Sequence, residues 1–183
     1  MKLIQSPKRF RSARHQTPHT VTLHHTAGSL KGSEDYSINV THFGYHFMID
    51  RDGTVYAYNP VTEEVAHSLE ANTGYIGVAF IAGGTELGPV QQNQYQAAVE
   101  LLTKLQQDYG DTLKYVTDHA TIDVLVSGRC AKSDPQWAGE HVDQNNWDIK
   151  HHYIDMIAND TGLLAIKTDG KISIGANNED TQE

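Results

Sequence analysis

The stretch Tyr75-Ile76-Gly77-Val78-Ala79-Phe80-Ile81-Ala82 is apolar at nearly every position and ends at Gly83-Gly84. A continuous apolar run is typical of a strand buried on both faces of a sheet, because both rows of its side chains then face a core. Helices must cover such a sheet, and apolar residues recur at helical spacing farther along the chain, ahead of Gly110. They are Tyr95, Ala98, Val99, Leu102 and Leu105. We therefore predict a central strand at residues 75–82 with a long helix packed on it.

Other segments add strands around this one. Residues 20–24 and 114–117 have the β-branched pattern of strands, and Arg51-Asp52-Gly53 predicts a hairpin turn between strands at residues 45–49 and 54–58. A second helix is predicted over residues 135–156. This order predicts an α/β fold, a single domain with a mixed central β-sheet flanked by helices. We expect residues 1–19 to form an irregular basic arm, residues 20–160 the catalytic domain, and residues 161–183 a C-terminal extension that is flexible at its end.

Composition narrows the function classes. The chain has 183 residues, one domain's worth, with 38% hydrophobic residues and a single cysteine, which excludes a disulfide-stapled fold. No apolar run approaches the roughly 20 residues of a membrane span, and no signal peptide is visible. The formal net charge is -9, although residues 1–33 hold six basic side chains and no acid. The acidic remainder disfavours nucleic acid as a partner.

The chemistry-bearing residues lie at strand ends and in one loop. His24 ends a predicted strand, His119 follows another, and Asp134 lies in the loop Lys132-Ser133-Asp134-Pro135. Two imidazoles and one carboxylate are a three-ligand set for Zn²⁺ that leaves the fourth position open for water, as catalytic sites do. Cys130 is the alternative third ligand. The neighbouring His25 points to the opposite face of the strand, which favours a packing role.

Four segments, in order over roughly residues 20–136, resemble the zinc-dependent N-acetylmuramoyl-L-alanine amidases, a family that includes small bacteriophage endolysins and peptidoglycan-recognition proteins. They are His24-His25-Thr26-Ala27-Gly28; Tyr45-His46-Phe47 with the Arg-Asp-Gly hairpin; Ala66-His67-Ser68 with Ile76-Gly77-Val78; and His119 with Gly128-Arg129 and the Lys132–Asp134 loop. The central strand carries Val78-Ala79-Phe80 where some relatives have a glutamate general base, so the chain resembles the phage branch, which uses tyrosine. That branch often has cysteine as its third ligand, where this chain has Asp134.

The resemblance implies residue roles. His24, His119 and Asp134 would bind zinc, and Lys132 would donate to the oxyanion of the tetrahedral intermediate. Tyr45 would orient water or share the proton transfer, and His67 would contact substrate or assist proton transfer. The enzyme would cleave the amide between muramic acid and L-alanine.

The resemblance also implies a setting. The partner would be peptidoglycan or a muropeptide, and the role that of a phage endolysin in the host cytoplasm, reaching the wall with a holin. A cytoplasmic muropeptide-recycling amidase of bacteria and a non-catalytic peptidoglycan receptor are the alternatives. Some phage amidases of this type also bind the phage RNA polymerase, but nothing in this sequence beyond the resemblance supports such a contact.

Overall fold

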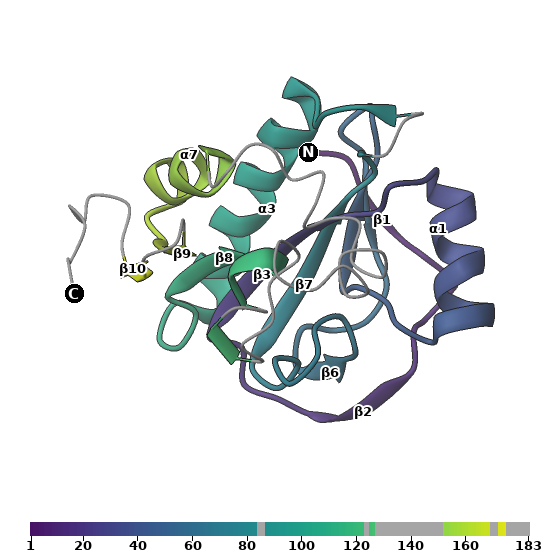
Figure 1. Ribbon diagram of the computed structural model, residues 1–183, viewed down its shortest axis with the longest axis horizontal. Helices are drawn as coiled ribbons and strands as arrows, with labels where there is room; N and C mark the ends of the chain where they lie inside the picture. Colours follow the sequence, from purple (N-terminus) through teal and green to yellow (C-terminus); the bar gives the residue numbers. More distant parts are fainter. Residues whose placement is uncertain (84–86, 123–124, 127–151, 169–171, 175–183) are drawn as a thin grey trace.

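Strand β7 (Tyr75–Phe80) lies at the centre of the sheet in the computed structural model, which describes residues 1–83, 87–122, 125–126, 152–168 and 172–174. Its neighbours β3 (Thr20–His25) and β4 (Phe47–Ile49) both run parallel to it (Figure 1). Every residue of β7 except Tyr75 is buried. The predicted central strand is therefore confirmed, with its end at Phe80.

The described strands form one large sheet and one small ribbon. Starting from one edge, the order in the sheet is β1 (Leu3–Gln5), β5 (Val55–Ala57), β4, β7, β3, β8 (Tyr115–Asp118), β9 (Leu164–Thr168) and β10 (Ile172–Ile174). The pairs β4–β5 and β9–β10 are antiparallel and the others are parallel. In the ribbon, β2 (Ser12–His15) pairs with β6 (Glu63–Val65). The predicted mixed sheet with flanking helices is confirmed.

Helices cover the two faces of the sheet differently. Helices α3 (Gln92–Tyr109) and α7 (His152–Thr161) cover one face (Figure 1). They share a hydrophobic core with strand side chains that include Leu23 and Val78. Helix α1 (Leu30–Tyr36) and the short π-helix η1 (Ser37–Thr41) lie on the other side, which we call the α1 face. Because strand side chains alternate, His24 points to the α1 face, opposite Leu23.

The N-terminal segment is part of the fold. The expectation that residues 1–19 are an irregular arm is wrong for β1 and β2, which pair with β5 and β6. Three basic side chains of this segment form ion pairs with acids elsewhere in the chain. Lys8 lies 2.6 Å from Glu34 and Arg14 lies 2.7 Å from Glu64, and Arg9 pairs with Glu63.

The C-terminal part differs from the sequence prediction in two ways. Much of the helix predicted over residues 135–156 lies outside the described residues, but α7 continues past Met156 to Thr161. Residues 164–168 and 172–174, within the predicted C-terminal extension, form the paired strands β9 and β10, and residues 175–183 lie outside the described part. In the described part of the chain, no helix is both long and apolar enough to cross a membrane.

Candidate active site

Two of the predicted metal ligands meet at the ends of adjacent parallel strands. The register of β3 and β8 pairs Leu23 with Asp118, so the next residues along the two strands are His24 and His119. Their ring centroids are 4.7 Å apart, and the residues are only 1% and 8% exposed. The carboxyl ends of parallel strands are a common location for ligand sites.

The turn after β8 holds His119 in place. The short helix α4 (His119–Ile122) begins directly after the strand, and the carboxylate Oδ1 of Asp118 accepts a hydrogen bond from the backbone N–H of Thr121 (2.7 Å). An aspartate that accepts from the backbone two or three residues ahead is typical of a helix N-terminus. The cap therefore fixes where the chain leaves the strand, and with it the position of the His119 imidazole.

Tyr45 lies beside His24. The two ring centroids are 4.9 Å apart. Tyr45 comes just before β4, and the next residue ties this backbone to the central strand, since the N–H of His46 donates to the carbonyl of Gly77 (2.9 Å). The side chain is half-buried against the apolar cluster of the α1 face. The Tyr45 ring therefore forms one wall beside the His24 imidazole.

His67 also lies beside His24, with the two ring centroids 5.2 Å apart. Its Nδ1 lies 3.1 Å from Nε2 of His24, and its own Nε2 lies 3.2 Å from the carbonyl oxygen of Tyr75. The residue is 6% exposed. Burial lowers the pKa of His67 well below the ordinary value, and the nearby imidazoles of His24, His46 and His119 lower it further. A neutral ring is thus favoured. We call His24, His67 and His119 the imidazole cluster.

Three residues that the sequence interpretation left without a role support this cluster. The side-chain oxygen of Asn72 accepts from the backbone N–H groups of His67 and Ser68, both at 2.8 Å, and so holds the loop after β6. Gly77 leaves room for the His67 ring, since a Cβ there would lie 2.7 Å from the ring's Cγ. A glycine inside a strand is a signal of such close approach and could have marked this position.

His46 is the third supporting residue, and its ring connects the central strand β7 to β6 through hydrogen bonds. Its Nδ1 accepts from the N–H of Gly77 (2.9 Å), and its Nε2 lies 2.7 Å from the carbonyl of Glu63. Burial lowers the pKa of His46 to about 4, despite the opposing effect of the Glu63 carbonyl. This imidazole is therefore neutral near pH 7 and serves as a structural hydrogen-bonding group.

The structure brings together two imidazoles that could serve as zinc ligands, those of His24 and His119. Zinc accepts imidazole nitrogens at about 2.0–2.1 Å, so two rings that share an ion must be close neighbours, as His24 and His119 are. Within the described ranges, no group of three His, Cys, Asp or Glu side chains is arranged to hold a metal ion. The remaining predicted residues, Lys132 and Asp134, and the alternative ligand Cys130 lie outside the described residues.

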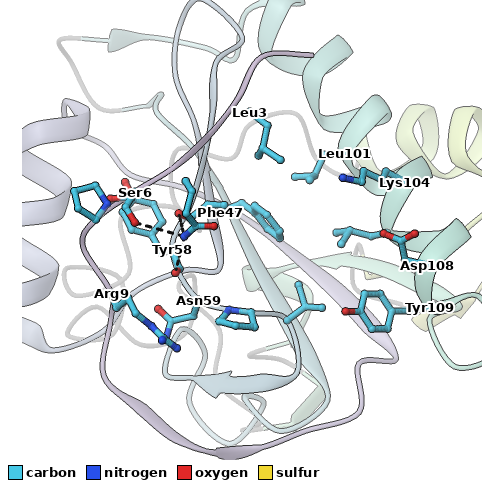
Figure 2. A pocket seen from close by; sticks show the side chains of 16 residues that line it. Leu3, Ser6, Arg9, Phe47, Tyr58, Asn59, Leu101, Lys104, Asp108 and Tyr109 are labelled. Carbon is cyan, nitrogen blue, oxygen red and sulfur yellow. Dashed lines mark hydrogen bonds between the residues drawn. The ribbon is translucent and has the colours of Figure 1, made fainter.

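A separate cavity of about 490 Å³ lies between the β1–β5 edge of the sheet and α3. Figure 2 shows Leu3, Phe47 and Leu101 around its apolar part, with Lys104 and Asp108 on the α3 side. Its lining, as far as the structure describes it, contains no residue of the imidazole cluster. The cavity therefore belongs to the packing of the long helix and not to the candidate site.

Comparison with known proteins gives a family and a fold. The profile of the family described as N-acetylmuramoyl-L-alanine amidase matches residues 14–137. A search of curated protein sequences gives no match.

Among solved structures, the chain is similar to the N-acetylmuramoyl-L-alanine amidase LysC from Clostridium intestinale (TM-score 0.55, 21% identity, covering 65% of this chain and 83% of that one). It is also similar to the Drosophila peptidoglycan recognition protein SD (TM-score 0.52, 23% identity, 66% and 83% covered). A third similar structure is the ectodomain complex of peptidoglycan recognition proteins LCa and LCx with bound tracheal cytotoxin (TM-score 0.54, 21% identity, 66% and 86% covered). At these identities the likeness shows the fold alone.

Proposed function

Because the chain belongs to the N-acetylmuramoyl-L-alanine amidase family, we propose that it hydrolyses the amide between N-acetylmuramic acid and L-alanine of peptidoglycan with a zinc ion held by His24, His119 and Asp134. The predicted family, fold class and enzyme class are confirmed by the family match and the fold. The observation that carries the proposal is the meeting of His24 and His119, whose ring centroids are 4.7 Å apart at the ends of adjacent strands.

The chemistry divides between the ion and the side chains around it. When bound, zinc supplies a Lewis acid for the amide carbonyl and brings the pKa of a water molecule toward neutrality. His24 and His119 provide two nitrogen ligands from strand ends, and Asp134 provides the third ligand in our proposal. The buried position of the two imidazoles strengthens electrostatic interactions with the reacting groups, because the local dielectric constant is low.

Tyr45 and Lys132 are the proposed catalytic side chains. The ring of Tyr45 lies against His24 (4.9 Å between centroids), so its hydroxyl can orient the attacking water and take part in proton transfer. Lys132, two residues before Asp134, would donate a hydrogen bond to the oxyanion that forms when the amide carbonyl is attacked. The buried residues at the centre of β7, Val78 to Phe80, supply no carboxylate that could act as general base.

The biological role that we propose is that of a phage endolysin acting from the host cytoplasm during lysis. Two other roles fit the same fold, namely muropeptide recycling in the bacterial cytoplasm and non-catalytic binding, as in a receptor. The likeness to recognition proteins supports the receptor alternative at the level of the fold. Intact sacculi and soluble anhydro-muropeptides separate the catalytic roles, since an endolysin must cleave the intact wall.

The test is digestion of purified sacculi followed by mass spectrometry of the released products. We expect stem peptides with a free L-alanine amino terminus and glycan strands with free lactyl groups. Treatment with a chelator should abolish release, and added Zn²⁺ should restore it. Cleavage of the soluble muropeptide alone would reject the endolysin role. Binding to sacculi without any release by the zinc-loaded protein would favour the receptor.

A further inference from the structure

The backbone just before Tyr45 is covered by an aromatic ring from the N-terminal segment. A Cβ added to Gly44 would lie 2.1 Å from Cγ of Phe10 and 2.4 and 2.5 Å from its two Cδ atoms, so the phenyl ring rests on the Cα of this glycine. Phe10 is 5% exposed and belongs to the apolar cluster of the α1 face. Tyr45 packs against the same cluster, so the two aromatic residues share one packing unit although they lie far apart in the sequence.

Hydrogen bonds hold Phe10 at this place. The side chain of Asn59 accepts from the N–H of Phe10 (2.9 Å) and donates to its carbonyl oxygen (3.1 Å), as a neighbouring strand would. The ring of Tyr58 lies 4.7 Å from that of Phe10, and its hydroxyl donates to Glu34 of helix α1 (2.6 Å). Glu34 also accepts from Lys8 (2.6 Å), which ties the chain just before Phe10 to the same helix.

The backbone around Tyr45 is also held from the side of the sheet. The N–H of Gly44 donates to the carbonyl of Ala66, and the N–H of His46 donates to that of Gly77, both at 2.9 Å. Two hydrogen bonds still let the segment tilt about the line that joins them. A ring packed on the Cα of Gly44 limits this tilt, because a close-packed interior leaves no room for the segment to move toward it.

We propose that Phe10 is a positioning residue, whose ring on Gly44 holds Tyr45 against the imidazole of His24, where the two ring centroids are 4.9 Å apart. The inference rests on the proposed function, in which Tyr45 orients the attacking water and takes part in proton transfer. Such a group must be held accurately, since a displacement of about 1 Å can lower a rate by about 100-fold. The N-terminal segment therefore supports the site as well as the sheet edge.

The first test compares Phe10→Ala with Leu105→Ala. Both variants lose a buried apolar side chain (5% and 6% exposed) and should lose similar stability, but Leu105 lies on α3, over the opposite face of the sheet. We expect Phe10→Ala to lower kcat for peptide release from solubilised peptidoglycan by about 10- to 100-fold with KM unchanged, and Leu105→Ala to keep the parent kcat. Circular dichroism shows that each variant is folded under the assay conditions. Zinc affinity, measured by competition with a chelating dye, should be that of the parent in both.

A second variant, Gly44→Ala, tests the same contact from its other side and serves if Phe10→Ala fails to fold. The added methyl group meets the Phe10 ring, so we expect a lower kcat here too. The double variant should be no slower than Phe10→Ala alone, because the methyl group then enters the space that the ring has left.

The ring protons of His24 report the position of Tyr45 without any catalysis, because a nearby aromatic ring shifts their NMR resonances. Tyr45→Leu in the metal-free protein defines the shift that Tyr45 causes. We expect Phe10→Ala and Gly44→Ala to move the His24 resonances toward those of Tyr45→Leu, and Leu105→Ala to leave them in place.

Parent-like kcat, or parent-like His24 resonances, in folded Phe10→Ala and Gly44→Ala would overturn the inference and leave the proposed function standing. A parent chain that binds zinc but releases no peptide overturns the proposed function, and the His24 resonances then decide the inference alone.

Discussion

Gly77 shows how one missing side chain shapes the site. A strand position buried on both sides normally holds an apolar side chain, and glycine there weakens the strand. At this position the space is taken by the His67 ring, whose Cγ would lie 2.7 Å from an added Cβ. The central strand therefore loses packing at one residue and in exchange brings an imidazole within hydrogen-bonding distance of His24.

Replacing Gly77 by alanine should move His67 away from His24. We expect Gly77→Ala to lower the free energy of unfolding by about 1–3 kcal/mol, as overpacked cores do, and to weaken zinc binding. Urea unfolding and dye competition measure the two effects. Gly28→Ala is the control, because the nearest atom to a Cβ there lies at an ordinary contact distance of 3.8 Å. Unchanged zinc affinity in Gly77→Ala would contradict the role given to this glycine.

The buried His46 predicts a pH dependence of stability. Its pKa in the folded chain is about 4, below the ordinary 6.5, so between these values the unfolded chain binds a proton that the folded chain does not. The contribution of neutral His46 to the free energy of unfolding is therefore fully present above about pH 6.5. It is lost as the pH drops toward 4, by roughly 3 kcal/mol for this group.

The measurement is urea unfolding at a series of pH values between about 4 and 7, on the parent chain and on His46→Gln. The slope of the unfolding free energy against pH reports how many protons the chain takes up on unfolding, and we expect this number to be smaller by about one in the variant. His67, whose pKa is also lowered, keeps part of the slope in both proteins. Identical slopes would show that His46 is not the neutral buried group described above.

At the scale of elements, a helix or strand could be predicted from the sequence where its own residues form a long apolar pattern. β7 and α3 carry long apolar patterns and were predicted nearly in full. β1 and β2 are three and four residues long and mostly exposed, so they are too short to show a periodic apolar pattern. They form because β5 and β6 offer partners far along the chain. Likewise His24 and His119 were predicted as strand-end residues, but only the register of β3 and β8 makes them neighbours.

The N-terminal segment should contribute to stability as the packing of Phe10 indicates. Phe10 is 5% exposed and its ring lies 4.7 Å from that of Tyr58, so Phe10→Ala should cost about 3–5 kcal/mol in urea unfolding. The matched control is Phe43→Ala, at a side chain that is 60% exposed, where we expect a change within about 0.5 kcal/mol. Equal, small effects of both substitutions would mean that the segment is a dispensable arm after all.

At the scale of the whole molecule, charge is distributed differently from what the sequence alone indicates. The chain has a formal net charge of -9, and the first 33 residues hold six of its 14 basic side chains. Three of these six, Lys8, Arg9 and Arg14, form ion pairs with Glu34, Glu63 and Glu64. Such pairing reduces the positive field that a free arm would offer an anionic wall. We therefore expect recognition of peptidoglycan to come from the surface around the imidazole cluster.

The central claim is that His24, His119 and Asp134 together hold one zinc ion, and metal analysis of purified variants tests it most directly. The parent chain and Cys130→Ser should each retain about one zinc per chain, while His24→Ala, His119→Ala and Asp134→Ala should each lose it. Circular dichroism confirms that every variant is folded. Zinc retained in Asp134→Ala but lost in Cys130→Ser would contradict the ligand set, and zinc retained in both histidine variants would contradict the site itself.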